Sequence, residues 1–358
     1  MENAENNHRS SVTINITKLI MKYFGLAGVF LVISSASIYF VHRVVSEGKF
    51  TIDPRFFSIQ VISVLLILLI LYFLSDGLRL YAVIRAMGFQ IPFLYIMKLV
   101  FINIFVSNVT PFATGGGVVQ MYFITKHGIP IGEAGAATLI RTLLASLILF
   151  TLTPVIILLE PNLFSTFSNN YVLYIIIGFS LAYLLVFWLI IMKNKKLKIL
   201  ILNTFLLLRK LNFLKTKRMR KIYLKFSKEL DVFSKSFINY FTLSPFWAIL
   251  SVIFTTMFLL LLFSFSVVLL KAIGYNIPVL TILSFQVVVT FFMYFTPTPG
   301  ASGVAEGGYG LLFSQLVNNH DITMLTLSWR FLTVYVGVII GILITYKEIL
   351  KPKKTKQN

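Results

Sequence analysis

The stretch Thr296-Pro297-Thr298-Pro299-Gly300-Ala301-Ser302-Gly303 separates two apolar runs near the end of this 358-residue chain. Residues 279–297 form the run before it, and residues 304–317 form a shorter run after it. Proline ends a helix because it lacks an N–H donor, and glycine lets backbones approach closely. The pattern therefore predicts a sharp turn between two helical segments. Five residues of this turn are candidate substrate-binding residues: Thr296, Pro299, Gly300, Ser302 and Gly303.

A related pattern lies 186 residues earlier in the chain. Residues 86–120 match residues 272–306 without a gap at 11 of 35 positions. The match aligns the Thr-Pro at Thr110 with the first Thr-Pro of the later turn, and it aligns Gln120 with Glu306. Apolar bias alone would not align Gly, Pro and Thr-Pro together, so we infer an internal duplication. The earlier turn adds five candidate substrate-binding residues: Thr110, Gly115, Gly116, Gly117 and Gln120.

The composition excludes a soluble enzyme. Hydrophobic residues make up 58% of the chain, charged residues 12%, and the mean hydropathy is +0.88, whereas a soluble domain averages about 45–50% apolar and 25% charged residues. A helix needs roughly 20 apolar residues to cross a bilayer core of about 30 Å. Six runs meet this length: 19–41, 57–75, 135–159, 171–192, 245–270 and 323–346.

The loop charges predict the topology. Residues 193–244 carry fourteen Lys/Arg and the tail 347–358 carries five Lys, which places both segments in the cytoplasm, while the uncharged residues 161–170 belong outside. An even number of crossings must then separate the basic segments, so 279–317 is predicted to form a re-entrant hairpin. The same reasoning predicts a hairpin at 93–126. Non-helical backbone at membrane depth requires surrounding protein or a watery cavity, so the hairpins imply a cavity.

The predicted fold is an all-α polytopic membrane protein with about six transmembrane helices and two re-entrant hairpins. Residues 1–346 form one domain of two inverted repeats, about 19–160 and 171–346, with both termini in the cytoplasm. Inverted repeats with broken helices are typical of transporters that bind substrate near the bilayer midplane. A half-helix beginning at each hairpin tip would present free N–H groups and a positive dipole end, which favour an anion.

One arginine lies inside the span after each turn. Arg141 and Arg330 follow the matched glycines by 24 and 27 residues, so the second copy has three additional residues. A charged residue there costs at least about 2.5–3.5 kcal/mol on insertion scales. Each arginine is either a salt bridge or carbonyl clamp that fixes helix packing, or a guanidinium fork for a phosphate. Glu306 is open to three roles: a helix cap, a partner of Arg330, or a contact for a cationic headgroup or a proton. Asp76 is interpreted as an interfacial ion pair with a nearby arginine such as Arg79.

Several other function classes lack support in the sequence. There is no Cys, the four His are scattered, and no Walker-type motif is present, so neither a metal site nor a cofactor nor ATP binding is expected. Residues 193–235 mix Lys/Arg with Leu, Ile and Phe. This pattern favours an interfacial helix on anionic lipid over nucleic-acid binding.

These residues resemble the lysylphosphatidylglycerol synthase transmembrane-region family, over roughly residues 20–346. This family includes the membrane half of the bacterial multiple peptide resistance factor and free-standing flippase-like relatives. The resemblance rests on Thr110-Pro111 with Gly115-Gly116-Gly117, on Arg141, on Pro299-Gly300 with Gly303 and Glu306, and on Trp329-Arg330. Many relatives have Arg or a carboxylate near Gln120 and a Glu where this chain has Ile140. The first half therefore departs from the family pattern.

The resemblance implies a lipid flippase of the bacterial inner membrane. Its substrate would be a phospholipid such as phosphatidylglycerol or lysyl-phosphatidylglycerol, whose translocation lowers the negative surface charge and gives resistance to cationic antibiotic peptides. The chain ends twelve residues after Tyr346, so we expect no aminoacyl-transferase domain and no enzyme activity. A secondary transporter of a small organic anion and a membrane component of a lysyltransferase-type system remain alternatives. A homo-oligomer and a separate lipid-synthesis enzyme as partner also stay open.

Overall fold

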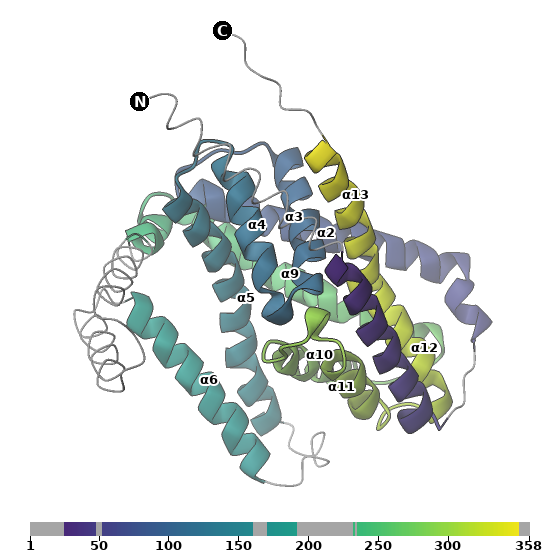
Figure 1. Ribbon diagram of the computed structural model, residues 1–358. Coiled ribbons are helices and arrows are strands. Elements are labelled where there is room, and N and C mark those ends of the chain that lie inside the picture. Colours follow the sequence, from purple (N-terminus) through teal and green to yellow (C-terminus); the bar gives the residue numbers. More distant parts are fainter. Residues whose placement is uncertain (1–24, 48–51, 160–169, 192–231, 233–234, 351–358) are drawn as a thin grey trace, which may run out of the picture. The chain divides into compact units, whose positions relative to one another are not determined.

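The computed structural model describes residues 25–47, 52–159, 170–191, 232 and 235–350 (Figure 1). All regular secondary structure in these ranges is helical. The predicted interfacial helix at 193–235 lies almost entirely outside the described residues, as does most of the basic tail 347–358.

Long helices alternate with short ones along the chain. The α-helices after the first helix are α2 (Ile59–Ala86), α3 (Phe93–Val109), α4 (Thr114–Thr125), α5 (Ile131–Leu159), α6 (Asn170–Ile191), α9 (Pro245–Ala272), α10 (Val279–Met293), α11 (Val304–Phe313), α12 (Asn319–Arg330) and α13 (Val336–Leu350). Three 3₁₀ turns, η2 (Pro54–Phe57), η3 (Pro111–Ala113) and η5 (Pro299–Ala301), and two π-helical segments, η1 (Val41–Val45) and η6 (Phe331–Tyr335), complete the order.

Five helices of the described chain are long and apolar enough to cross a membrane. They are Gly25–Val45, Ile59–Ala86, Ile131–Leu159, Pro245–Ala272 and Asn319–Glu348. Each coincides with a predicted span, so five of the six predictions are confirmed on length and composition. The sixth predicted run, 171–192, coincides with α6. Helices α3 and α10 have 17 and 15 residues and end at the predicted turns.

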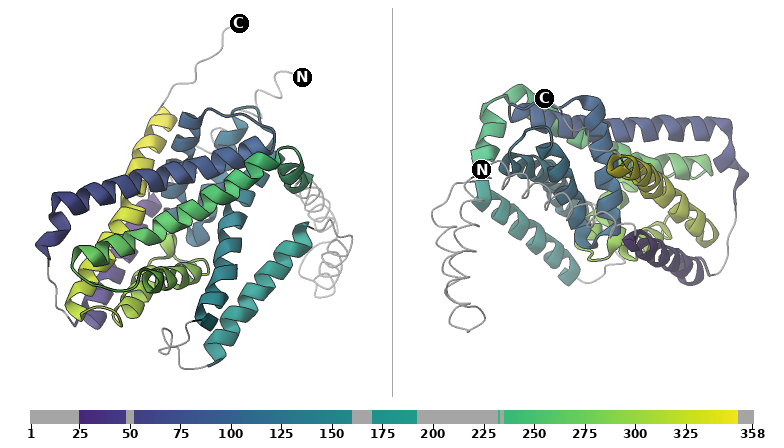
Figure 2. Two further views of the ribbon diagram at one scale, coloured as in Figure 1. Left: turned by 180° about the vertical axis from the view of Figure 1, so that it is seen from behind. Right: turned by 45° about the horizontal axis from the view of Figure 1, so that its top comes forward.

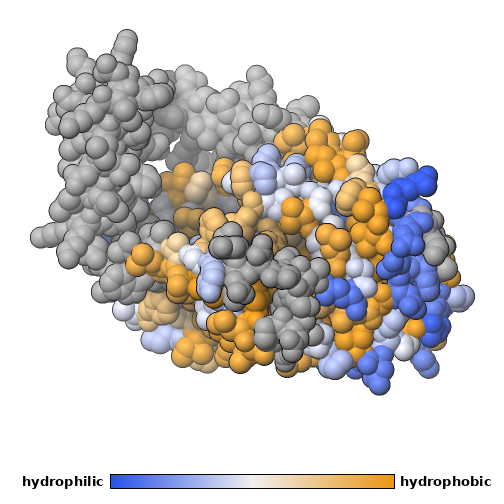
Figure 3. Space-filling model, turned by 90° about the horizontal axis from the view of Figure 1, so that it is seen from below, coloured by the Kyte–Doolittle hydropathy of each residue, from blue (hydrophilic) through white to orange (hydrophobic). Residues whose placement is uncertain are grey.

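The surface and the interior have reversed polarity compared with a soluble protein. Large apolar side chains such as Ile59, Val32 and Phe246 are 78%, 70% and 65% exposed, and apolar residues cover much of the face seen in Figure 3. Asp76, Glu306 and Arg330 are buried. Apolar side chains can face lipid without cost, whereas charges in a span face the interior and find partners there.

The chain divides into two compact units. Unit 1 comprises residues 1–74, 97–120 and 260–358, and unit 2 comprises residues 75–96 and 121–259. Helices α2, α3, α4 and α9 contribute residues to both. Each unit therefore contains segments of both predicted repeats, and the boundary between the units does not follow the boundary between the repeats.

Helices α2 and α9 lie side by side and antiparallel within each unit (Figure 2). In unit 1 the rings of Tyr72 and Phe265 meet edge to face with centroids 5.7 Å apart. In unit 2 Tyr81 and Trp247 meet in the same way at 5.6 Å. Edge-to-face aromatic pairs are worth about 0.5–1.5 kcal/mol beyond their buried area.

The two predicted turns fold alike, but in a different register from the ungapped alignment. Each is a 3₁₀ turn that begins with Pro after a threonine N-cap: Thr110 before Pro111, and Thr298 before Pro299. Each contains two residues with positive φ, Phe112 and Ala113 in η3 and Gly300 and Ala301 in η5. The structural offset at the tips is therefore 188 residues, and the predicted match of Thr110 with Thr296 is wrong by two. The shared motif is Thr-Pro-x-Ala-Ser/Thr-Gly.

This register changes the interpretation of the second copy. Two of its three additional residues precede the tip, because Thr110 corresponds to Thr298 while Arg141 and Arg330 differ by 189. Gln120 consequently does not correspond to Glu306 in the tip register. The two tips, η3 and η5, lie next to each other in unit 1. Their neighbouring positions fit a pair of hairpins, whose inverted relation remains a prediction.

Two adjacent glycines of α4 provide a test of the packing. A Cβ on Gly116 would lie 1.9 Å from Ser107 Oγ and 2.9 Å from the Asn103 carbonyl oxygen, whereas a Cβ on Gly117 would meet nothing within 4 Å. We expect Gly116→Ala to lower the free energy of unfolding by about 1–3 kcal/mol through overpacking. Gly117→Ala should leave it unchanged or raise it by up to about 1 kcal/mol. Thermal unfolding of both variants in one detergent measures this, and equal destabilisation would contradict the α3–α4 packing.

Candidate functional site

Arg330, the last residue of α12, is fully buried in unit 1 and contacts the second tip. Its Nε donates to Glu306 Oε1 at 2.8 Å. Its Nη2 donates to the Gly300 carbonyl at 2.8 Å and to Ser302 Oγ at 3.5 Å. Gly300, Ser302, Gly303, Glu306 and Arg330 are called the Arg330 cluster below. The guanidinium fastens the tip to the last span.

Glu306 occupies the first turn of α11 and its side chain is 0% exposed. Oε1 accepts from Arg330 and from Ser34 Oγ at 3.2 Å, while Oε2 accepts the Gly303 N–H at 2.8 Å. The carboxylate therefore caps its own helix and also pairs with Arg330, which confirms two of its three predicted roles. It occupies one of the amides that the sequence suggested for an anion. A contact with a headgroup stays a prediction.

The Arg330 guanidinium keeps one free donor. Within the described residues, buried Nη1 has no hydrogen-bond partner. A buried donor without a partner costs about 1–3 kcal/mol, and more for a charged group. A ligand oxygen that accepted this hydrogen bond would recover that energy. The π-helical segment η6 follows Arg330 directly, and π-turns within α-helices occur frequently at functional sites.

Gly300 allows the close approach at the second tip. It has a φ of +61°, which favours glycine, and a Cβ there would lie 2.5 Å from the Phe30 ring and 3.1 Å from Asn108 Oδ1. The tip is thus enclosed by the first helix and by α3. Gly303, with a φ of +97°, then starts α11 and presents its N–H to Glu306. Both glycines are needed for the backbone to reach Arg330.

The other predicted residues of the tips have mainly packing contacts. Thr110 Oγ1 accepts the Gly115 N–H at 3.1 Å and donates to the Val106 carbonyl at 2.8 Å, which closes η3 against α3. Gln120 Nε2 donates to the Leu99 carbonyl at 3.4 Å. Thr296 Oγ1 donates to the Phe292 carbonyl at 3.1 Å, and Pro299 begins η5. These residues hold the hairpins together.

Arg141 lies in unit 2 with partners of its own. Asp76 Oδ1 accepts from Arg141 Nη2 at 2.5 Å and from Arg79 Nε at 2.6 Å. The side chains of Asp76, Arg79 and Arg141 are 3%, 9% and 6% exposed. The Arg79 guanidinium also lies 3.8 Å above the centroid of the Phe258 ring. These contacts meet the sequence alternative of a salt bridge that fixes helix packing, and a second role in binding stays a prediction.

Sequence reasoning missed three contributors to these clusters. It found the contact between Asp76 and Arg79, but not that Asp76 is buried and shared with Arg141. Asp76 is the one carboxylate of the 28-residue helix α2, which was a usable signal. Ser34, which hydrogen-bonds both Glu306 and Tyr335, had no usable signal because hydroxyls are common in apolar helices.

The fold and its two clusters define a class: a polytopic helical membrane protein with paired helix breaks and buried arginine–carboxylate contacts. The chain belongs to the lysylphosphatidylglycerol synthase TM region family, whose model matches residues 19–341. It is also similar to the UPF0104 membrane protein of Archaeoglobus fulgidus, with 24% identity over 285 residues, which cover 80% of this chain and 85% of that protein. The family resemblance seen in the sequence is confirmed.

Removing either partner of the Glu306–Arg330 pair should destabilise the protein strongly. Glu306→Gln leaves a buried guanidinium without its carboxylate, and Arg330→Met leaves the reverse, so each should cost about 3–5 kcal/mol. The double variant should lose much less than the sum. Thermal unfolding at one pH in one detergent measures all three proteins.

The matched control is the pair Lys98–Glu348 of unit 1, which is 3.0 Å apart and whose lysine side chain is 41% exposed. Lys98→Met should cost no more than about 1 kcal/mol. Additive losses in the Glu306–Arg330 cycle would contradict the assigned pair.

Proposed function

We propose that this chain translocates phospholipids between the leaflets of the membrane, and that Arg330 binds the lipid phosphate. The observation that carries the proposal is the buried Arg330 guanidinium, which contacts the tip of a broken helix and retains an unsatisfied donor at Nη1. Phosphate is the group that all glycerophospholipids share. Arginine suits it because its planar fork donates two hydrogen bonds to neighbouring oxygens.

Phosphate binding and tip movement would be coupled through Arg330. A phosphate oxygen accepts from Nη1 and a second one competes with the Gly300 carbonyl for Nη2. Loss of the Gly300 contact releases the second tip from the last span. Glu306 retains its hydrogen bond to Arg330 Nε, so the arginine stays compensated when the site is empty. A ligand shifts such an equilibrium only through its different affinity for the two states.

The proposed arrangement is the one predicted from the loop charges. Two inverted repeats place hairpins 93–126 and 279–317 on opposite sides of a bacterial inner membrane, both termini are cytoplasmic, and the hairpins gate in alternation. Because the chain has no cysteine, single cysteines at Lys126 and Asn319 test this orientation by labelling from opposite sides. Labelling of both from the same side would refute it.

The preferred substrates are phosphatidylglycerol and aminoacylated phosphatidylglycerol, and the chain itself performs no aminoacyl transfer. The relatives' family description, a lysylphosphatidylglycerol synthase TM region, supports this substrate class. Any resistance to cationic peptides would follow from lipid translocation together with a separate synthesis enzyme. A small organic anion could occupy the same guanidinium site, and competition by phospholipid separates the two transporter hypotheses. Aminoacyl transfer by the purified chain would instead support the lysyltransferase alternative.

Translocation in liposomes tests the function. We expect the reconstituted protein to move fluorescently labelled phosphatidylglycerol, and we expect Arg330→Lys to slow it by about 10–150-fold. The expected loss corresponds to one hydrogen bond to a charged group, about 1.5–3 kcal/mol. Lysine keeps the charge but loses the fork.

The matched control is Arg43→Lys, because exposed Arg43 contacts only the Tyr39 side chain in the structure's printed polar contacts and lies outside the Arg330 cluster. Equal rates in both variants and the wild type would refute a phosphate role for Arg330. No movement above empty liposomes, with folded protein, would refute the lipid pathway.

A further inference from the structure

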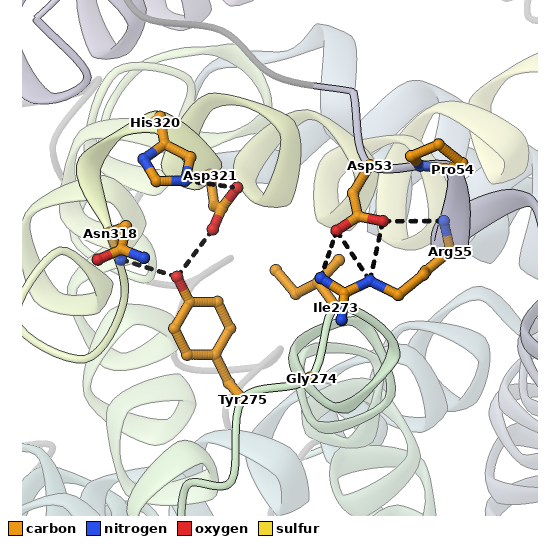
Figure 4. Close-up of a pocket in the computed structure, with 9 residues that line it drawn as sticks. All are labelled: Asp53, Pro54, Arg55, Ile273, Gly274, Tyr275, Asn318, His320 and Asp321. Carbon is orange, nitrogen blue, oxygen red and sulfur yellow. Dashed lines mark hydrogen bonds and ion pairs between the residues drawn. The ribbon is translucent and has the colours of Figure 1, made fainter.

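Unit 1 contains a second polar site, a pocket of about 500 Å³ (Figure 4). It forms where three connections meet: the one before α2, the one after α9 and the one that leads into α12. We call it the Tyr275 pocket. Its polar and charged lining residues are Asp53, Arg55, Tyr275, Asn318, His320 and Asp321. None of them belongs to the Arg330 cluster.

One wall of the pocket is a fixed ion pair. Arg55 Nη2 donates to Asp53 Oδ2 at 2.6 Å, and Arg55 Nε donates to both carboxylate oxygens at 3.0 Å. These hydrogen bonds from Arg55 hold the pKa of Asp53 below its usual value. Gly274, with a φ of +93°, leaves room for the guanidinium, because a Cβ there would lie 2.7 Å from Arg55 Nη1. Asp53 and Arg55 therefore cancel each other's charge.

The opposite wall orients a second carboxylate. Tyr275 donates its hydroxyl hydrogen to Asp321 Oδ2 at 2.8 Å and accepts the Asn318 N–H at 2.9 Å. Burial raises the pKa of Tyr275, so the hydroxyl remains a donor at neutral pH. In Figure 4, Tyr275 points towards Asp321 and Asn318, while the Asp53–Arg55 pair lies to one side.

The charges in the pocket leave one negative charge over. His320 Nε2 lies 3.6 Å from Asp321 Oδ1 and carries a charge only when protonated. With neutral His320, Asp321 lacks a cationic side chain to cancel it among the pocket's lining residues. This contrasts with the whole chain, which has a net charge of +20 and only 12 acidic residues. An acidic pocket on such a basic protein favours a cationic ligand.

The pocket lies at one end of the longest span. Asp321 is near the start of the 30-residue helix Asn319–Glu348, which extends about 45 Å at 1.5 Å per residue. The basic C-terminal end of that helix is proposed to be cytoplasmic, so the pocket faces the outside. Its volume falls within the range of small-molecule sites, about 300–1,000 Å³. The described residues contain no group of three His, Asp or Glu able to hold a metal ion.

We propose that the Tyr275 pocket binds an aliphatic ammonium group at the outer membrane face, with Asp321 as its counter-ion and the Asp53–Arg55 pair as a fixed wall. The proposal rests on the proposed function only for the side of the membrane. The ammonium group has two sources, an amine-bearing lipid headgroup or a free amine in solution. Both present the same chemistry to Asp321.

Titration calorimetry with lysine methyl ester tests binding to the full chain in an uncharged detergent. We expect Asp321→Asn to raise the Kd at least about tenfold, because a hydrogen-bonded charge pair is lost. Asp53→Asn should also raise it, since Arg55 would then repel the ammonium, and it provides the answer if Asp321→Asn does not fold. The control is Glu47→Gln, which removes an exposed carboxylate outside the pocket and should leave the Kd unchanged.

A second arm identifies the source. Micelles containing lysyl-phosphatidylglycerol that displace lysine methyl ester, where phosphatidylglycerol micelles do not, indicate a headgroup. Binding that depends on Asp321 without such displacement indicates a free amine, and both results support the pocket. Wild-type affinity in both pocket variants, or an equal loss in Glu47→Gln, overturns it. Binding is measured without translocation, so this result and the flippase result stand independently.

Discussion

The Arg330 guanidinium is a charge buried inside an apolar helical protein, and the surrounding structure is arranged to compensate it. Glu306 supplies the opposite charge, and it can do so because α11 begins at Gly303. That start requires a backbone with positive φ at Gly300 and Gly303. One residue therefore links the last span, the helix break and the glycines of the tip. Removal of either charge would leave the other buried and uncompensated.

Close backbone approach is the second requirement of this arrangement. A Cβ on Gly341 of α13 would lie 2.3 Å from the Phe101 carbonyl oxygen of α3, and one on Gly116 would collide with Ser107. Small residues at such positions let helices pack without a hydrophobic driving force between them. The broken helices α3 and α10 can therefore end inside unit 1 while their neighbours satisfy the free backbone groups.

Much of this could be predicted from the sequence, because its strongest signals are local. Length and apolarity marked the spans, and Pro with Gly marked both tips. The register of the second tip was misassigned because Thr296-Pro297 and Thr298-Pro299 follow each other, and only the 3₁₀ geometry distinguishes them. The sharing of Asp76 between Arg79 and Arg141 depends on contacts 65 residues apart in the chain. Periodicity does not encode such contacts.

The clusters in the two units differ in what surrounds the arginine. In unit 1 the guanidinium contacts a backbone carbonyl of a tip, whereas in unit 2 Arg141 and Arg79 share a side-chain carboxylate between helices. A carbonyl contact is readily exchanged for a ligand oxygen, since no second charge is left uncompensated when it breaks. This difference favours the Arg330 cluster as the moving part and the Asp76, Arg79 and Arg141 contacts as a support.

Hydrogen exchange at the second tip tests the central claim most directly, that lipid phosphate takes Arg330 away from Gly300. The protein in an uncharged detergent would be compared before and after addition of phosphatidylglycerol, with exchange followed in peptides covering 296–306. The account predicts faster exchange of the tip amides with lipid, and no such change in Arg330→Lys. Unchanged or slower exchange in the wild type would contradict it.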